Sequence, residues 1–189
     1  DGFLNRPLQR IALRDVVLRN RFGIFGLARR SALLEAGGFD AAAGGADDRD
    51  MLIKLASRGP VYKLDALLLN YRLHPASMSS NPAKHTRDTA TVLARAKELC
   101  GDLLPPSDWR LAEAIYHHQV ALNWSAAGDT AAAVKHSLLS MSVVPWILDC
   151  DSIGLPFLGR FRFLLRVGRD WTLSMFGVRP GTPSVPTHG

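Results

Sequence analysis

Residues 33–51 read LLEAGGFDAAAGGADDRDM, and this stretch decides the fold that we expect for the chain. The glycine pair at 37–38 follows a short periodic apolar run, and glycine accepts the positive φ at which helices commonly end. After an alanine-glycine loop, which we expect to be flexible, a second helix begins at Asp47 or Asp48. Acidic residues in a first turn match the helix dipole. This helix ends at Gly59-Pro60, so the stretch predicts two helices joined by a loop.

The segments around this stretch alternate between helix and strand patterns. Helical spacing of apolar residues is typical of amphipathic helices, whereas short β-branched and aromatic runs are typical of strands. The expected elements are a helix over 7–20, a strand over 22–28, a helix capped by Ser31, and strands over 61–64 and 67–73. This order indicates an α/β domain.

The pattern changes after Lys84, where alanine-rich helical spacing takes over. We expect helices over 87–99, 108–127, 130–143 and 158–176, separated by proline and glycine. The chain therefore divides into an α/β portion over residues 1–82, an α-helical extension over 83–178 and a disordered tail over 179–189.

Composition narrows the class of protein. The 189 residues are 47% hydrophobic, which is typical of a folded globular chain, and the net charge of +6 favours anionic partners. Nucleic acid is not expected, because the basic residues lack interleaved aromatics and a recognisable motif. Cys100 and Cys150 form neither a disulfide framework nor a zinc site, and no apolar run is long enough to cross a bilayer. A cytoplasmic location is the simplest interpretation.

The acidic cluster Asp47, Asp48 and Asp50 is the first candidate for chemistry. In a helix, Asp47 and Asp50 share a face, whereas Asp48 points elsewhere. A positioned carboxylate can serve as a general base. For the DDRD string taken alone, a solvated helix start stabilised by its dipole is the competing interpretation.

Arg72 and His74 are the second candidate. They lie two residues apart near the end of an expected strand, so they project to the same side. A guanidinium and an imidazole there can meet a diphosphate or a metal-bound phosphate. For this pair alone, a surface arginine and a satisfied histidine on an edge strand is the competing interpretation.

Three phrases occur together in this order: LARRSALLEAGGFD at 27–40, ADDRDMLIKLASRG at 46–59 and LNYRLHPASMS at 69–79. Together they resemble the catalytic domain of family 2 glycosyltransferases, the inverting enzymes with a GT-A fold, over roughly residues 10–80. The resemblance implies an α/β fold: the C-terminal half of a GT-A (nucleotide-diphospho-sugar transferase) domain, followed by a helical appendage. No Asp-x-Asp motif precedes Phe22. We therefore expect a longer parent enzyme, and no transferase activity from the 189 residues alone.

The resemblance also implies roles for single residues. Asp48 stands where the family has its catalytic base, and Asp47 stands where a supporting acid, more often Glu, precedes it. Arg49 occupies a position that is more often aromatic. The remaining implied sites are an acceptor loop of Gly37, Gly38, Phe39 and Asp40, and Arg72 and His74 near the donor diphosphate, with His74 as a candidate metal ligand. The expected cofactor is a divalent cation, Mg²⁺ or Mn²⁺.

The implied partners are a nucleotide-sugar donor and a glycan, lipid-linked or protein acceptor, as in the synthesis of cell-surface polysaccharides. The alternative is a non-catalytic basic helical module that binds a membrane surface or a protein partner. Residues 158–176 combine a broad apolar face with arginines, so they can lie on an anionic membrane surface. That would make the protein peripheral at the inner face of the membrane. Burial of this helix against the rest of the protein fits the same pattern.

Overall fold

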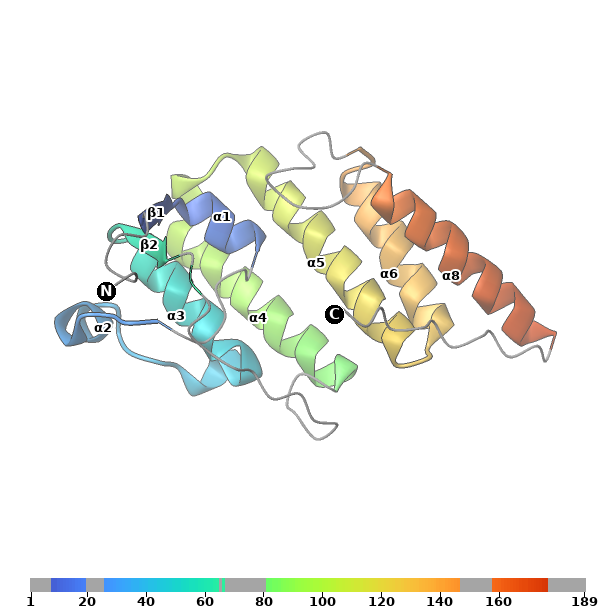
Figure 1. The fold of residues 1–189 in the computed structure, drawn as a ribbon, viewed down its shortest axis with the longest axis horizontal. Helices are drawn as coiled ribbons and strands as arrows, with labels where there is room; N and C mark the ends of the chain where they lie inside the picture. The colour runs from blue at the N-terminus through green and yellow to red at the C-terminus, as the bar shows by residue number, and fades with distance from the viewer. Residues whose placement is uncertain (1–7, 20–25, 65, 67–80, 147–157, 177–189) are drawn as a thin grey trace. The chain divides into compact units, whose positions relative to one another are not determined.

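The computed structural model describes residues 8–19, 26–64, 66, 81–146 and 158–176 (Figure 1). Helices make up most of this part, and two short strands form one sheet. In chain order the elements are β1 (Leu8–Ile11), α1 (Leu13–Leu18), α2 (Arg30–Glu35), η1 (Ala41–Ala46), α3 (Asp47–Ala56), β2 (Val61–Leu64), α4 (Pro82–Cys100), η3 (Gly101–Leu103), α5 (Pro106–Ala126), α6 (Thr130–Val143) and α8 (Gly159–Met175).

The predicted α/β fold, with the C-terminal half of a GT-A domain, is wrong. The sheet contains only β1 and β2 among the described residues, and the two strands pair antiparallel, with Leu8 opposite Leu64 and Ile11 opposite Val61. The helices α4 and α5, which were expected in an appendage, pack into the same core as α1 and α3. The architecture is mostly helical because apolar faces of helices cover one another, and the short sheet covers little.

The helix predicted over residues 7–20 is also wrong in its first half. Leu8–Ile11 is a strand, and helix begins only at Leu13. The first segment has helical spacing of its apolar residues, but pairing with β2 satisfies its backbone groups across the sheet. Asp15 then stabilises the start of α1, since its Oδ2 accepts a hydrogen bond from the Ala12 amide at 3.3 Å.

Contacts divide the chain into two compact units, residues 1–116 and 117–189. In the first unit α3 packs on α1, α4 and η1. Val92, Ala96 and Cys100 recur every four residues on α4 and so present one buried face. The rest of the buried core is Ile11, Val16, Val17, Leu18, Ala43, Ala46, Ile53, Trp109 and Ala112.

The second unit contains the end of α5 together with α6 and α8, which run side by side (Figure 1). Its small core consists of Ala121, Ala133, Phe163 and Val167. Arg160 is buried and ties the start of α8 to the end of α6. Its Nη1 donates to the carbonyl and the hydroxyl of Ser140, each at 2.9 Å. These bonds satisfy a carbonyl near the end of α6.

Several predicted elements are confirmed. The strand at 61–64 and the helices α3, α5, α6 and α8 appear close to their expected positions. Helix α4 starts at Pro82, before the predicted residue 87, because the Asn81 side chain accepts a hydrogen bond from the Lys84 amide. Gly26 to Ala28 form no strand. The rest of the predicted strand at 22–28 (residues 22–25), the strand at 67–73 and the tail at 179–189 lie outside the described residues.

Candidate functional site

The acceptor loop predicted at Gly37–Asp40 follows directly from the end of α2. The Gly38 amide donates to the Leu33 carbonyl at 2.9 Å, and both glycines have positive φ, 86° for Gly37 and 70° for Gly38. This is a Schellman-type helix end, so the prediction that a helix ends at the glycine pair is confirmed. Ser31 does not cap α2, since Arg29 occupies the N-cap position. Phe39 then projects into solvent, with 63% of its surface exposed.

Two cations from different helices hold this loop. Lys54 on α3 donates from Nζ to the Gly38 carbonyl at 3.2 Å, and Arg95 on α4 donates from Nη2 to Oδ2 of Asp40. Asp40 Oδ1 also accepts from the Ala42 amide at 2.8 Å. These hydrogen bonds, first that of Ala42 and then that of Arg95, lower the pKa of Asp40. The loop is therefore held at Gly38 and at Asp40.

The same two cations meet at Asp50, which is 5% exposed. Lys54 Nζ lies 2.7 Å from Oδ2 of Asp50, and Arg95 Nε donates to its Oδ1 at 3.2 Å. The hydrogen bonds to Asp40 and Asp50 raise the pKa of Arg95. Asp50 is thus a buried carboxylate with two cationic partners, and we call Asp40, Asp50, Lys54 and Arg95 the charge network.

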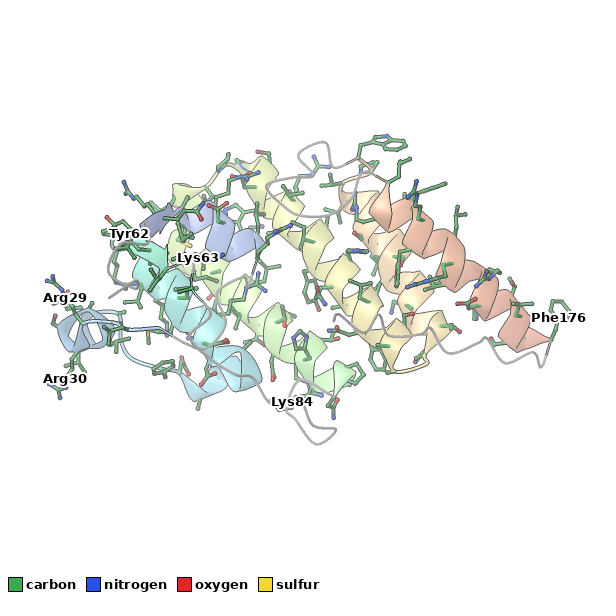
Figure 2. The ribbon with its side chains drawn as sticks, viewed as in Figure 1. Arg29, Arg30, Tyr62, Lys63, Lys84 and Phe176 are labelled. Carbon is green, nitrogen blue, oxygen red and sulfur yellow. The ribbon has the colours of Figure 1, made fainter. Side chains whose placement is uncertain are left out.

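The alanine-glycine segment is a 3-10 helix, η1, rather than the flexible loop that its composition predicts. The Gly45 amide donates to Oδ2 of Asp88 on α4 at 2.8 Å, and Lys84 forms an ion pair with the same carboxylate. Figure 2 shows Lys84 near the N-terminal end of α4. The hydrogen bonds from Lys84 and Gly45 lower the pKa of Asp88. Helix α4 therefore holds both ends of the segment that leads into α3.

Asp47 and Asp48 form the first turn of α3 and are both half-buried. Asp47 Oδ1 accepts from the Asp48 amide at 3.0 Å, and Asp48 Oδ1 accepts from the Arg49 amide at 2.7 Å. These amides have no acceptor within the helix, so the carboxylates satisfy them. The described residues leave Oδ2 of Asp48 without a hydrogen bond. Asp48 therefore differs from Asp50, whose two oxygens both face cations.

Two basic side chains flank Asp48. Arg49 turns inward and donates from Nη2 to the Val17 carbonyl at 2.6 Å, which fastens α3 to α1. Burial lowers the pKa of Arg49, and the charge of Asp48 opposes that change. His85 on α4 also lies in this region. Burial, followed by the charge of Arg49, lowers the pKa of His85, whereas Asp88 and Asp48 act in the opposite direction.

The predicted donor-side residues Arg72 and His74 lie outside the described residues. Within residues 8–19, 26–64, 66, 81–146 and 158–176, no three His, Cys, Asp or Glu side chains are grouped so that they could hold a metal ion. Sequence reasoning missed Lys54, Arg95 and His85. The i, i+4 spacing of Asp50 and Lys54 is a signal for the first, but no local pattern connects α3 with the other two on α4.

Comparison of the chain with protein-family models, with curated proteins and with solved structures finds no match. The resemblance to family 2 glycosyltransferases therefore rests on the three sequence phrases.

Proposed function

We propose that the chain supplies the acceptor-activating part of a glycosyltransferase, which moves a sugar from a nucleotide-diphosphate donor to an acceptor hydroxyl with inversion. Asp48 is the general base of this proposal. The observation that carries it is the contrast within one helix: Asp50 is buried between Lys54 and Arg95, whereas Asp48 is half-exposed and keeps one oxygen available among the described contacts. A base needs such an oxygen.

The proposed reaction is a single displacement. Asp48 Oδ2 takes the proton of the acceptor hydroxyl while the hydroxyl oxygen forms a bond to the anomeric carbon. The bond from that carbon to the donor phosphate oxygen breaks at the same time, and the nucleoside diphosphate leaves with the electron pair on the opposite face. The first-turn hydrogen bond from the Arg49 amide holds Asp48 in a fixed orientation, so little reorganisation precedes proton transfer.

The loop before α3 supports the same proposal. Lys54 fixes the Gly38 carbonyl and Arg95 fixes Asp40, so exposed Phe39 stands between two anchored residues. An exposed aromatic ring on a fixed loop offers an apolar surface for an acceptor. The charge network thus connects the proposed acceptor surface to the helix that carries Asp48.

The resemblance implies a divalent cation at the departing diphosphate, and that ion would supply charge stabilisation. The described residues do not form a site that fits such an ion, and the candidate ligand His74 lies outside them. The cation therefore stays a prediction.

The test is Asp48→Asn in the longest reading frame that contains this chain, with release of nucleoside diphosphate from a panel of nucleotide sugars as the readout. We expect transfer to fall by about a hundredfold or more, because general bases contribute roughly 10²–10⁴-fold. The Asn oxygen can still accept from the Arg49 amide, so the unfolding midpoint stays near that of the parent protein.

The matched control is Asp129→Asn. Asp129 is also an N-terminal helix carboxylate, and it accepts from the Ala132 amide at 2.9 Å in the second unit. We expect this variant to transfer sugar at the parent rate. Full turnover by Asp48→Asn, or an equal loss in both variants, contradicts the assignment of Asp48. In the same assay, the 189 residues alone are expected to show no donor turnover.

A further inference from the structure

We propose that the exposed faces of α6 and α8 dock onto the surface of an anionic phospholipid bilayer. We call these faces the α6–α8 surface. The proposal goes beyond sugar transfer and does not depend on Asp48, because every residue that carries it belongs to the second unit.

Helix α8 has an apolar row on its exposed side. Phe163 and Val167 lie four apart and are buried, so they define the inner side of the helix. Phe161 and Leu165, also four apart, lie on the outer side, where Leu165 is 59% exposed. Phe176 follows at the end of the helix and projects from it (Figure 2). Large apolar side chains in such a row indicate a binding surface rather than ordinary solvent exposure.

A groove lies between α6 and α8, and Trp171 is the residue of α8 that lines it. The groove has a volume of about 540 Å³, and its walls include Val134, Leu138 and Leu139 from α6 and Trp171 from α8. Leu138 is 53% exposed. Tryptophan is enriched at membrane interfaces, because its side chain combines an apolar ring system with a polar N–H group. The α6–α8 surface thus includes this groove as well as the exposed apolar residues of α8.

Cations border the apolar row. Arg162 and Arg166 each follow one residue after a member of the row, so they form a parallel line on the next face of the helix. Both are exposed, and neither forms an ion pair with a carboxylate in the described part of the chain. The guanidinium of Arg166 lies over the Phe163 ring, 5.0 Å from its centroid. Lys135 stands in the groove wall. Long basic side chains can lie along apolar surface and still reach headgroup phosphates.

An anionic bilayer surface fits exposed apolar residues flanked by arginines better than a second copy of the chain does. An interfacial helix buries its apolar face at the headgroup boundary and gains from anionic lipid through flanking arginines. No helix in the described residues is long and apolar enough to cross a membrane. A second copy of the chain would bring Arg162 and Arg166 of both copies together. The nearby acid, Asp170, is already paired with Arg169.

The test uses the 189-residue chain and co-sedimentation with vesicles of phosphatidylcholine containing about one third phosphatidylserine, against vesicles of phosphatidylcholine alone. We expect binding to the anionic vesicles that weakens with salt, and little binding to the neutral ones. The double variant Leu165→Ser with Met175→Ser should bind about tenfold or more weakly, because it removes two exposed apolar side chains. Arg162→Gln and Arg166→Gln should each weaken binding about fivefold.

Matched controls lie in the first unit. Leu34→Ser removes a leucine that is 61% exposed on α2, and Arg87→Gln removes an exposed arginine on α4. Both variants should bind like the parent chain, and circular dichroism should show helical content unchanged in all variants. Trp171→Phe should abolish the part of the fluorescence blue shift that vesicles induce at the groove.

Four outcomes overturn the proposal. The first three are absence of binding to anionic vesicles, equal binding to anionic and neutral vesicles, and parent-like binding by the Leu165 and Met175 variant. A fourth is a dimer in sedimentation equilibrium that the same variant dissociates while vesicles fail to bind, since the surface would then be an interface between copies. Because the readout is lipid binding, failure here leaves the Asp48 experiment unaffected.

Discussion

Arg95 and Asp50 are 45 residues apart in the sequence, and the Arg95 Nε donates to Asp50 Oδ1 at 3.2 Å. The same guanidinium also binds Asp40, so one side chain of α4 joins the start of α3 to the loop that precedes it. Asp50 is buried, and a buried carboxylate is stable only when it is paired. Removal of Arg95 should therefore affect both the stability of the first unit and the position of the loop.

Arg95→Gln should lower the free energy of unfolding by about 2 kcal/mol, because Asp50 would keep only Lys54 as a charged partner. The value is moderate because the Arg95 side chain is 31% exposed. Urea denaturation followed by circular dichroism measures it. Arg87→Gln is the control on the exposed side of α4 and should change stability by less than about 0.5 kcal/mol. Equal midpoints for the two variants would show that the charge network does not stabilise the fold.

Gly44→Ala should destabilise the first unit by about 2 kcal/mol, because Gly44 combines two constraints. Its φ of 61° and ψ of −130° lie in a region that residues with a Cβ rarely adopt, and an added Cβ would approach Asp88 Oδ1 to 2.5 Å. Gly101→Ala is the matched control, since Gly101 has helical φ and an added Cβ would make only ordinary contact with Lys97. A thermal shift in the Gly101 variant as large as that in the Gly44 variant contradicts the argument.

Stability should fall when the pH is lowered from about 6.5 to about 4, because His118 resists protonation in the fold. Burial, followed by the charge of Arg160, lowers the pKa of His118 from 6.5 to about 4, and its ring packs edge-on against Phe163. The unfolded chain binds the proton at higher pH, so this contribution is complete above pH 6.5 and is lost as pH falls to about 4. The loss amounts to roughly 3 kcal/mol.

The pH dependence is measured by denaturant midpoints across this window. His118→Gln should flatten the curve between pH 6.5 and 4, whereas His136→Gln should keep most of the slope. The pKa of His136 is also lowered, first by burial and then by the charge of His117. Replacing His136 should therefore remove only the contribution of His136 to the pH dependence of stability. A curve for His118→Gln that matches the parent protein would assign the acid sensitivity to other groups.

Local signals predicted the helices well. Gly37-Gly38 ends α2, the acidic first turn begins α3, and Gly59-Pro60 follows the end of α3. Each of these features depends on residues within one turn of one another, where backbone sterics and side-chain hydrogen bonds act directly. The position of the candidate base Asp48 could also be predicted from nearby sequence, since the DDRD string and the phrases around it place Asp48 in the first turn of a helix.

The strand at Leu8–Ile11 and the packing of α4 and α5 could not be predicted, because both depend on contacts between residues far apart in the sequence. Leu8–Ile11 has the spacing of a helix, yet it pairs with Val61–Leu64 as a strand, because cross-strand hydrogen bonds override a weak local preference. The expected α/β layers failed for the same reason: the apolar faces of α4 and α5 fit against α1 and α3. Amphipathic spacing shows that a face will be buried, but it does not identify the partner that buries it.

The sequence by itself determined where α2 ends, where α3 starts and ends, which carboxylates gather in the first turn of α3, and that α8 carries a broad apolar face. Only the tertiary structure decided that Asp50 is the buried acid, that Arg95 and Asp88 hold both ends of η1, and that much of the apolar surface of α8 stays exposed. The physical reason is distance along the chain. Helix ends depend on neighbouring backbone groups, whereas burial and ion pairing depend on residues that only folding brings together.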